Sequence, residues 1–301
     1  MPQASRDIKR RIKSITSTKK VTKAMEMIAA AKMRKSISAV LASRSYATLS
    51  WDLVKRLSGK THAKLHPLLK ERKVVKKAAL VLITSNRGLC GGFNAQIIQR
   101  ALHYVKSQSD NNVQVELVSL GKRGQDFMLK RSIPLVADFA KSDILTQVEE
   151  IRPLAKLLIN DYLKKKFDKV VLAYTDFVST LVQKPRIMEL LPFSGKGQDA
   201  ELGHLKATEA TTNKSEFEYL FEPSPDQVLE DLLPRLVEVQ VYQAILESTA
   251  SEHSARMVAM QNATEAANDM INSLTLAFNK ARQGAITAEL ADISGGRAAV
   301  E

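Results

Sequence analysis

The chain has 301 residues, of which 45% are hydrophobic and 26% charged, so it can form one or two globular domains and is too apolar for a disordered protein. Aromatic residues make up only 5%, which is typical of long helices packed through aliphatic side chains, and no apolar run approaches the roughly 20 residues that span a bilayer. The net charge of +13 is concentrated at one end, because residues 1–59 hold fourteen basic and three acidic residues, whereas residues 235–301 hold five and eight.

A single very long helix is predicted at the start of the chain. Residues 3–58 contain neither Gly nor Pro, and small or apolar side chains recur three, four or seven residues apart, which indicates one helix with a packing seam. The seam positions are Ile8, Ile12, Ile15, Thr22, Met25, Ala29, Met33, Ile37 and Leu41.

Basic side chains crowd the first part of this predicted helix. Almost no acidic residues are interleaved with them to form ion pairs one turn apart. Such a run is ordinarily a solvated helix face, but an unneutralised field along a rod also favours an acidic partner surface, on nucleic acid or on protein. The run consists of Lys9, Arg10, Arg11, Lys13, Lys19, Lys20 and Lys23.

The central sequence predicts a small α/β domain. Continuous apolar runs at residues 78–85, 113–121 and 169–175 are typical of buried strands. They alternate with helical patterns, as in a parallel sheet wrapped by helices. These patterns occupy residues 94–108, 123–131 and 144–166. A late pair of strands is predicted at residues 181–193 and 217–221, separated by a polar surface loop at 194–215.

A second long helix is predicted at residues 235–283, bounded by Pro234 and Gly284. Its seam is mostly alanine, which allows close approach of another helix, and a helix of about 50 residues is about 75 Å long. The seam consists of Val237, Val241, Ala244, Ala255, Ala259, Ala263, Ala267, Met270, Leu274, Ala277 and Ala281.

The predicted fold class is therefore α/β, with a long antiparallel coiled coil of the N- and C-terminal helices and a central Rossmann-like α/β domain. Each terminal helix can cover the apolar stripe of the other. The expected domains are residues 1–59 for the N-terminal coiled-coil helix, 60–222 for the α/β domain and 223–301 for the C-terminal coiled-coil helix.

Two segments partly match phosphate-binding loops. Gly59-Lys60-Thr61 has the end of such a loop, but the required earlier glycine is replaced by Val54. The glycine-rich segment at residues 85–94 follows the first predicted strand, yet its spacing does not give G-x-G-x-x-G. We expect a tight structural turn there, with Arg87 facing a partner, and no cofactor.

The remaining reactive side chains have structural explanations. Cys90 is the single cysteine, which excludes an internal disulfide and favours a reducing compartment. No His lies near it in sequence, so a small buried thiol is favoured over a nucleophile. His62 and His66 have a spacing that can bind metal on a helix, but Gly59 and Pro67 bracket them too tightly. We therefore expect neither a metal site nor a catalytic site.

Four segments resemble the gamma subunits of F-type ATP synthases, in the same order along the chain. Residues 15–35 resemble the amino-terminal helix of that family, and residues 85–94, reading SNRGLCGGFN, resemble its motif after the first strand. Residues 251–271 and 279–296 are similar to its carboxy-terminal helix. These matches cover both ends and the centre of the chain.

The resemblance implies a non-catalytic rotor shaft. A gamma subunit turns inside a ring of alternating alpha and beta subunits, and its foot contacts the membrane c-ring and an epsilon-type subunit. The resemblance implies neither nucleic-acid binding nor direct membrane insertion. It favours a peripheral protein on the cytoplasmic face of a bacterial inner membrane, with the matrix side of the mitochondrial inner membrane as the alternative. Redox control through an inserted cysteine pair is not expected, because Cys90 stands alone.

The same resemblance implies which residues contact partner subunits. Arg282 and Gln283 match contacts to beta-subunit loops, Arg87 a second contact point, and Met25 a position sensitive to coupling. The basic run would then face acidic beta segments. The subunit-contact residues predicted from it are Lys9, Arg10, Lys19, Lys20 and Lys23.

Two other functions compete with the rotor shaft. A basic coiled-coil nucleic-acid-binding scaffold would use the charge of residues 1–59 and bind with steep salt dependence, but that region has few aromatic residues for stacking on bases. A nucleotide-using α/β enzyme would need an intact phosphate loop or a paired acid and base in the central domain, and neither is visible in the sequence.

Overall fold

The computed structural model describes residues 3–60, 66–72, 74–143, 147–193 and 224–298. The predicted loop at 194–215 and strand at 217–221 lie outside these residues. The chain forms two compact units: unit 1 comprises residues 1–29 and 256–301, and unit 2 comprises residues 30–255. Helices α1 (Gln3–Lys60) and α5 (Pro225–Ala298) each contribute to both units.

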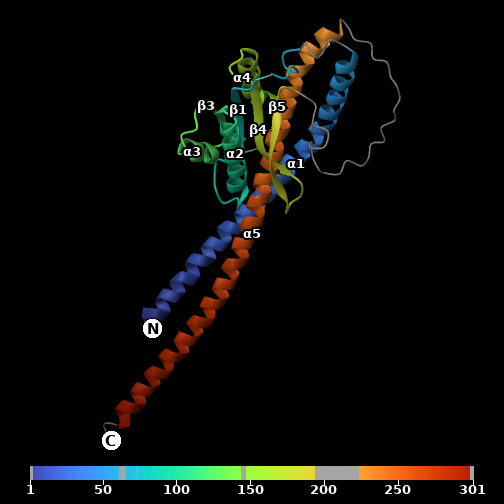
Figure 1. Ribbon diagram of the computed structural model, residues 1–301. Helices are drawn as coiled ribbons and strands as arrows, with labels where there is room; N and C mark the ends of the chain where they lie inside the picture. Colours follow the sequence, from blue (N-terminus) through green and yellow to red (C-terminus); the bar gives the residue numbers. More distant parts are fainter. Residues whose placement is uncertain (1–2, 61–65, 73, 144–146, 194–223, 299–301) are drawn as a thin grey trace. The chain divides into compact units, whose positions relative to one another are not determined.

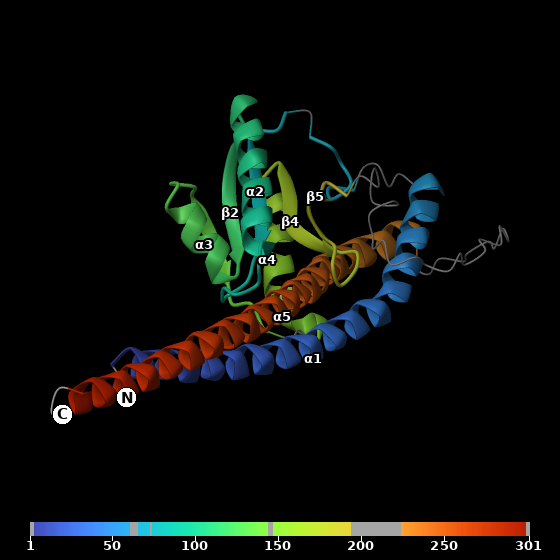
Figure 2. The same ribbon diagram turned by 90° about the horizontal axis from the view of Figure 1, so that it is seen from below.

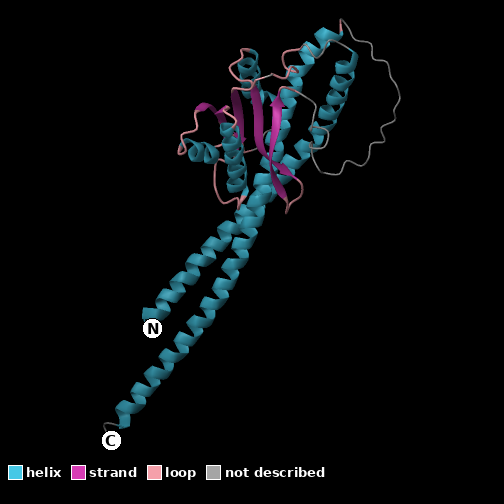
Figure 3. Cartoon of the chain, viewed as in Figure 1, coloured by secondary structure: helices cyan, strands magenta, loops and turns pink. Residues whose placement is uncertain are grey.

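Unit 2 contains a five-stranded sheet with the order β3-β2-β1-β4-β5 (Figure 3). Strands β3, β2, β1 and β4 run parallel to one another, whereas β4 and β5 form an antiparallel hairpin. The strands are β1 (Lys77–Ile83), β2 (Gln114–Leu120), β3 (Leu135–Phe139), β4 (Lys169–Phe177) and β5 (Gln183–Leu191). The sequence patterns located all of them except β3, whose short sequence is only half-buried and lacks a continuous apolar run.

Neighbouring side chains of a strand point to opposite faces, so the sheet contributes to two apolar cores. Ala79, Val81 and Ile83 of β1 belong to one core with α4 (Arg152–Leu163) and α5. Leu80 and Leu82 belong to the other core with α2 (Phe93–Asp110) and α3 (Lys122–Leu129). Figure 2 shows α2 and α4 on opposite sides of the sheet. A short 3-10 helix, η2 (Val148–Ile151), precedes α4.

Helix α5 extends beyond both of its predicted boundaries. Pro234 lies inside the helix, although its ring removes one backbone hydrogen bond. Leu233, Leu236 and Val237 are buried around it in the apolar core, which explains why packing overrides the local cost. Gly284 also lies inside α5, because an exposed helix tolerates one glycine at a cost of about 1 kcal/mol.

The two chain ends of unit 1 form an antiparallel helix pair (Figure 1). The hydroxyl oxygens of Thr22 and Thr264 are 2.8 Å apart, and Ala29, Met260 and Ala267 are buried. Small side chains at such contacts allow the helix axes to approach closely. The predicted antiparallel pairing of the terminal helices and the central α/β domain are thus confirmed.

The seam differs in detail from the predicted one. Met270 is 58% exposed and Leu41 is 51% exposed, and Ala277 is also exposed. Leu274 and Ala281 of the predicted seam are half-buried, and the other half-buried positions of α5 in this region are Ile271, Phe278 and Ala285. A fixed spacing read from the sequence drifts around a helix of 3.6 residues per turn. Among the described residues, no helix is long and apolar enough to cross a membrane.

Candidate functional site

The two carboxy-terminal candidates lie on an exposed stretch of α5 in unit 1. Arg282 and Gln283 are both exposed and follow each other in the helix, so a partner can reach both side chains. Arg282 is 18 residues beyond Thr264, which corresponds to about 27 Å along the helix axis. Met25 is half-buried only three residues from Thr22, the partner of Thr264. The structure therefore does not bring Met25 and Arg282 together.

The basic run is less uniform in the structure than in the sequence. Arg10 forms an ion pair of 2.8 Å with Asp7, and Lys23 forms one of 2.8 Å with Glu26, each within one turn of α1. Exposed pairs of this kind contribute about 0–1 kcal/mol and are easily exchanged for other partners. Within the described part of the chain, no ion pair is recorded for three predicted contact residues. These are Lys9, Lys19 and Lys20.

Exposed apolar side chains accompany these cations on unit 1, and they are not among the contact residues predicted from the sequence. Large hydrophobic residues are 49–72% exposed on both helices, which is typical of a surface that a partner covers. The sequence could have identified them, because all except Met270 are large apolar residues that fall outside the predicted packing seams. They are Val21, Met27, Ile28, Met270, Leu276, Ile286 and Leu290.

Arg87 lies in the loop between β1 and α2, within unit 2. The loop is held by Asn94, whose Nδ2 donates to Ser85 Oγ at 2.7 Å and to Cys90 Sγ at 3.2 Å. Ser85 Oγ in turn donates to the carbonyl oxygen of Arg87 at 2.5 Å. Cys90 is buried, as predicted for a structural thiol, while Leu89 adopts a φ of 63°. This rigid turn leaves the Arg87 side chain exposed.

The carboxyl edge of the parallel sheet, where Rossmann-like proteins bind nucleotides, is occupied by the chain itself. Asn86 follows β1, and its Nδ2 donates to the carbonyl oxygen of Lys141, which follows β3, at 2.8 Å. Lys141 then forms a buried ion pair of 2.5 Å with Glu252 of α5. Ser251 Oγ donates to the carbonyl oxygen of Thr175 in β4 at 3.2 Å. Helix α5 therefore stands where a ligand would otherwise lie.

Asp143 belongs to the same edge. Its carboxylate lies 2.7 Å from Lys32 Nζ, and the hydrogen bond from Lys32 lowers the pKa of Asp143 against the opposing effect of burial. His253 and Arg87 add positive charge that lowers this pKa further. Asp143 is consequently ionised at neutral pH and acts as an ion-pair partner rather than as a general acid.

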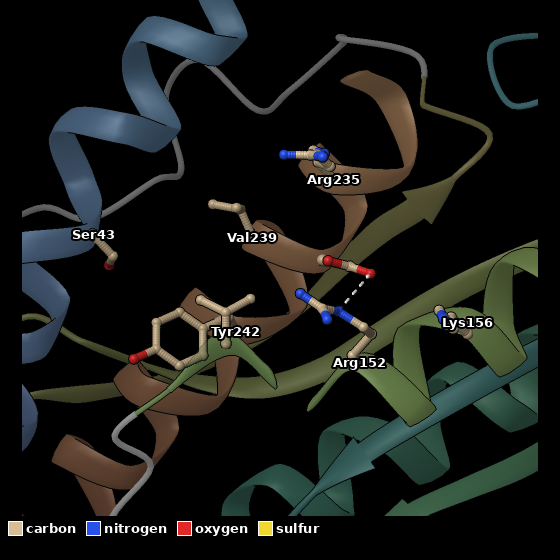
Figure 4. Close-up of a pocket in the computed structure, with 8 residues that line it drawn as sticks. Ser43, Arg152, Lys156, Arg235, Val239 and Tyr242 are labelled. Carbon is tan, nitrogen blue, oxygen red and sulfur yellow. Dashed lines mark ion pairs between the residues drawn. The ribbon is translucent and has the colours of Figure 1, made fainter. Parts of the chain in front are cut away.

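A cavity of about 580 Å³ lies elsewhere in unit 2, beside α4 and α5 (Figure 4). Among its charged lining residues, Arg152 is paired, because its Nε is 3.8 Å from Glu238 and its Nη2 is 3.6 Å from Glu149 outside the lining. Burial, with Glu150 and Glu149, raises the pKa of Tyr242. The described lining contains neither His nor Cys. It comprises Ser43, Val148, Arg152, Lys156, Arg235, Glu238, Val239 and Tyr242.

No metal centre is found among the described residues either, because they contain no cluster of three or more His, Cys, Asp or Glu suited to a metal ion. His66 Nδ1 accepts a hydrogen bond from the backbone N–H of Leu68 at 3.2 Å, and burial lowers the pKa of His66. His62 lies outside the described residues. The most extensive candidate surface is therefore the exposed helix pair of unit 1.

Sequence comparison places this architecture among known proteins. A family model described as ATP synthase matches residues 4–300. The ATP synthase gamma chain of Roseiflexus castenholzii is 41% identical over 298 residues, which cover 99% of this chain and 98% of the relative. The ATP synthase gamma chain of Pelotomaculum thermopropionicum is also 41% identical, over 98% of this chain and 99% of its own length.

Solved structures with a similar fold come from ATP synthases. A chain of the central stalk and c-ring structure of Tetrahymena thermophila mitochondrial ATP synthase has a TM-score of 0.58 at 25% identity, covering 81% of this chain and 99% of that one. A chain of the Euglena gracilis mitochondrial ATP synthase, in an assembly of OSCP, F1 and c-ring, has a TM-score of 0.64 at 21% identity, covering 99% and 94%.

Proposed function

Because the chain belongs to the ATP synthase gamma-chain family, we propose that it is the central rotor shaft of an F-type ATP synthase, coupling proton-driven rotation of the membrane ring to conformational change at the catalytic beta subunits. The observation that supports this most directly is the family match over residues 4–300, which spans both terminal helices and the α/β domain. The nucleic-acid scaffold has no support among these relatives.

The proposed mechanism follows from asymmetry. Three equivalent catalytic interfaces around one shaft meet different faces of it, so each interface is biased towards a different conformation. Rotation exchanges these biases. By linkage, a shaft orientation that tightens nucleotide binding is itself favoured by nucleotide, so torque and hydrolysis express one coupling free energy.

The shaft itself contributes no catalytic group in this proposal. Lys141, Glu252 and their neighbours make contacts with one another at the carboxyl edge of the sheet, where Rossmann-like proteins bind nucleotides. We assign the chemistry to the surrounding alpha and beta subunits and no cofactor to this chain.

The proposed contacts to these subunits lie on unit 1 and at Arg87. Arg282 and Gln283 can form charge-assisted and neutral hydrogen bonds to beta-subunit loops, since both are exposed. The cations of α1 would face acidic beta segments, and the exposed apolar side chains would be covered within the ring. Met25, which is half-buried, would influence coupling through the helix pair.

The remaining partners are an epsilon-type subunit and the membrane c-ring. We place the chain peripherally on the cytoplasmic face of a bacterial inner membrane, with the matrix side of the mitochondrial inner membrane as the alternative location. In this proposal the chain binds no nucleic acid and does not insert into the membrane.

The test is the ATPase activity of an alpha/beta assembly reconstituted with this chain. The wild-type chain should restore turnover, and Arg282→Ala with Gln283→Ala should reduce it by about tenfold, the loss of one or two charge-assisted hydrogen bonds. Asn272→Ala with Ser273→Ala, also exposed on α5, serves as the matched control and should leave turnover unchanged. A wild-type chain that neither assembles nor stimulates turnover would refute the proposal.

A further inference from the structure

One turn of α5 is buried on every side although it is polar. The four consecutive residues Ser251–Ser254 are between 0% and 6% exposed, and all lie in unit 2. With 3.6 residues per turn, four consecutive side chains point around the whole circumference of a helix. Burying polar groups is unfavourable unless each finds a partner. The arrangement of those partners indicates what this turn does.

The two serines bind opposite ends of one hairpin segment. Ser251 Oγ donates to the carbonyl oxygen of Thr175, within β4, at 3.2 Å. Ser254 Oγ donates to the carbonyl oxygen of Thr180, in the turn between β4 and β5, at 2.6 Å. These bonds fix the position of α5 along the β4–β5 hairpin.

The two residues between the serines bind the segment that follows β3. Glu252 forms its ion pair with Lys141, and their side chains are 7% and 2% exposed. His253 Nε2 lies 3.0 Å from the carbonyl oxygen of Asp143. Four successive side chains of α5 thus contact four different backbone or side-chain positions of the α/β domain.

The segment that receives Glu252 and His253 is itself anchored on two further sides. Asn86 Nδ2 donates to the carbonyl oxygen of Lys141 at 2.8 Å, and Lys141 Nζ lies 5.9 Å from the centre of the Phe93 ring. Lys32 of α1 pairs with Asp143 at 2.7 Å. The partner segment is therefore a fixed part of unit 2, tied to β1, α2 and α1.

Hydrogen bonds and ion pairs are directional, so they fix the rotation of a helix about its axis more narrowly than apolar contacts do. Earlier in α5, Val237, Val241 and Ile245 pack in the apolar core, where the attraction is non-directional and depends mainly on buried area. Rotation of α5 about its own axis would disturb the interdigitation of these side chains, but each could still meet apolar neighbours. The same rotation would separate Lys141 from Glu252 and leave two buried charges unpaired, which is strongly unfavourable.

We propose that Ser251–Ser254 form a torque key, a turn that fixes the rotational and axial register of α5 in the α/β domain and carries torque between that domain and the helix. This inference rests on the proposed function as a rotor shaft. The key is the last complete turn of α5 before Arg256, where unit 1 begins again. Its residues are positioning residues and touch no substrate.

The test removes the directional contacts and keeps the packing. Lys141→Met with Glu252→Met replaces the buried ion pair by apolar side chains of similar length, a change that often preserves folding. Lys77→Met with Glu116→Met is the matched control, because it removes a Lys–Glu pair of 3.5 Å between β1 and β2. Both variants are assembled into the complete ATP synthase in vesicles.

The measured quantity is the rate of proton-driven ATP synthesis divided by the rate of ATP hydrolysis by the detached catalytic part of the same complex. Synthesis needs torque to pass through the whole chain, whereas hydrolysis by the detached part does not. We expect this ratio to fall about fivefold or more in the Lys141/Glu252 variant, a typical coupling effect, and to stay unchanged in the control.

An unchanged ratio in an assembled Lys141/Glu252 variant would overturn the torque key. If that variant fails to assemble, Ser251→Ala with Ser254→Ala removes the hydrogen bonds of both hydroxyl groups without changing charge, and the same ratio must fall. A wild-type chain that supports neither activity would instead refute the rotor-shaft function, so the two failures are distinguishable.

Discussion

At the scale of single residues, Gly121 is a position where the backbone geometry requires glycine. It has a φ of 103°, and a Cβ atom added to it would overlap the carbonyl oxygen of Thr84. Gly121→Ala should lower the free energy of unfolding by about 3 kcal/mol or more, because both the strain and the clash involve backbone. Urea denaturation measures this loss.

Gly92→Ala provides the control for that substitution. A Cβ atom at residue 92 would meet only the Gln96 side chain, at 3.3 Å from its Nε2, and that side chain can move. Equal losses at residues 92 and 121 would contradict the account of Gly121.

Tyr104 carries a buried hydroxyl for which no hydrogen-bond partner is found among the described residues. Burial, followed by the charge of Glu189, raises the pKa of Tyr104 to about 12. Tyr104→Phe should therefore leave the free energy of unfolding unchanged or raise it by up to about 1 kcal/mol. Tyr162→Phe should lower it by about 1 kcal/mol, because it removes the hydrogen bond to the carbonyl oxygen of Lys70.

The raised pKa of Tyr104 also has a consequence for alkaline stability. The unfolded chain ionises this tyrosine near its ordinary pKa of 10.0, whereas the folded chain does so only near about 12. The neutral Tyr104 side chain therefore makes its full contribution to the free energy of unfolding below pH 10. This contribution is lost as the pH rises from 10 to about 12. A wild-type protein and a Tyr104→Phe variant with parallel stability profiles over this range would contradict it.

At the scale of elements, Arg72 and Asp168 tie the segment before β1 to the end of α4. Arg72 Nη1 lies 2.7 Å from Asp168, and Arg72 Nη2 donates to the carbonyl oxygen of Tyr162 at 2.6 Å. Burial alone would raise the pKa of Asp168, but hydrogen bonds from the backbone of Lys76 and Lys77 and from Arg72 lower it overall.

Asp168→Asn should consequently lower the free energy of unfolding at pH 7 by about 1–3 kcal/mol. Because the folded pKa is lowered, the contribution of Asp168 is present above the ordinary value of 3.8 and is lost as the pH falls through the folded pKa. Denaturation curves at pH 7 and pH 3 should show the difference between variant and wild type shrinking in acid. A difference independent of pH would argue against an ionised Asp168.

Gly284, unlike Gly121, is a position where a larger residue should stabilise the protein. An added Cβ atom would meet nothing within 4 Å, and the residue lies in regular helix. Gly284→Ala should stabilise this part of α5 by up to about 1 kcal/mol, since alanine loses less backbone entropy. Slower amide hydrogen exchange around residue 284 would be the sign of this, and faster exchange would contradict it.

The elements also show where sequence patterns succeed and where they stop. The buried strands β1, β2 and β4 were predictable because both of their faces are covered, which demands continuous apolar runs. Strand β3 was missed because it is only half-buried, and the start of α5 was misplaced because tertiary packing outweighs Pro234. The contacts of Ser251–Ser254 were beyond prediction, since their partners are 74 and more residues away in sequence.

At the scale of the whole molecule, the positive charge is a property of one helix rather than of the chain. Residues 1–59 hold almost all of the excess, which could equally have indicated nucleic-acid binding. The family resemblance of four short segments distinguished the two functions, and the comparisons confirmed it over nearly the full length. The contact residues Arg282, Gln283, Arg87 and Met25 remain predictions that require the assembled enzyme.

Rotation of this chain inside its assembly is the most direct measurement. Cys90 is buried and is the single cysteine, so Ser109→Cys on the exposed end of α2 creates one accessible thiol for a visible probe. In an immobilised alpha/beta assembly supplied with ATP, the probe should turn stepwise in one direction and stop when ATP is removed. An assembly that hydrolyses ATP while the probe keeps a fixed angle would contradict the rotor-shaft function.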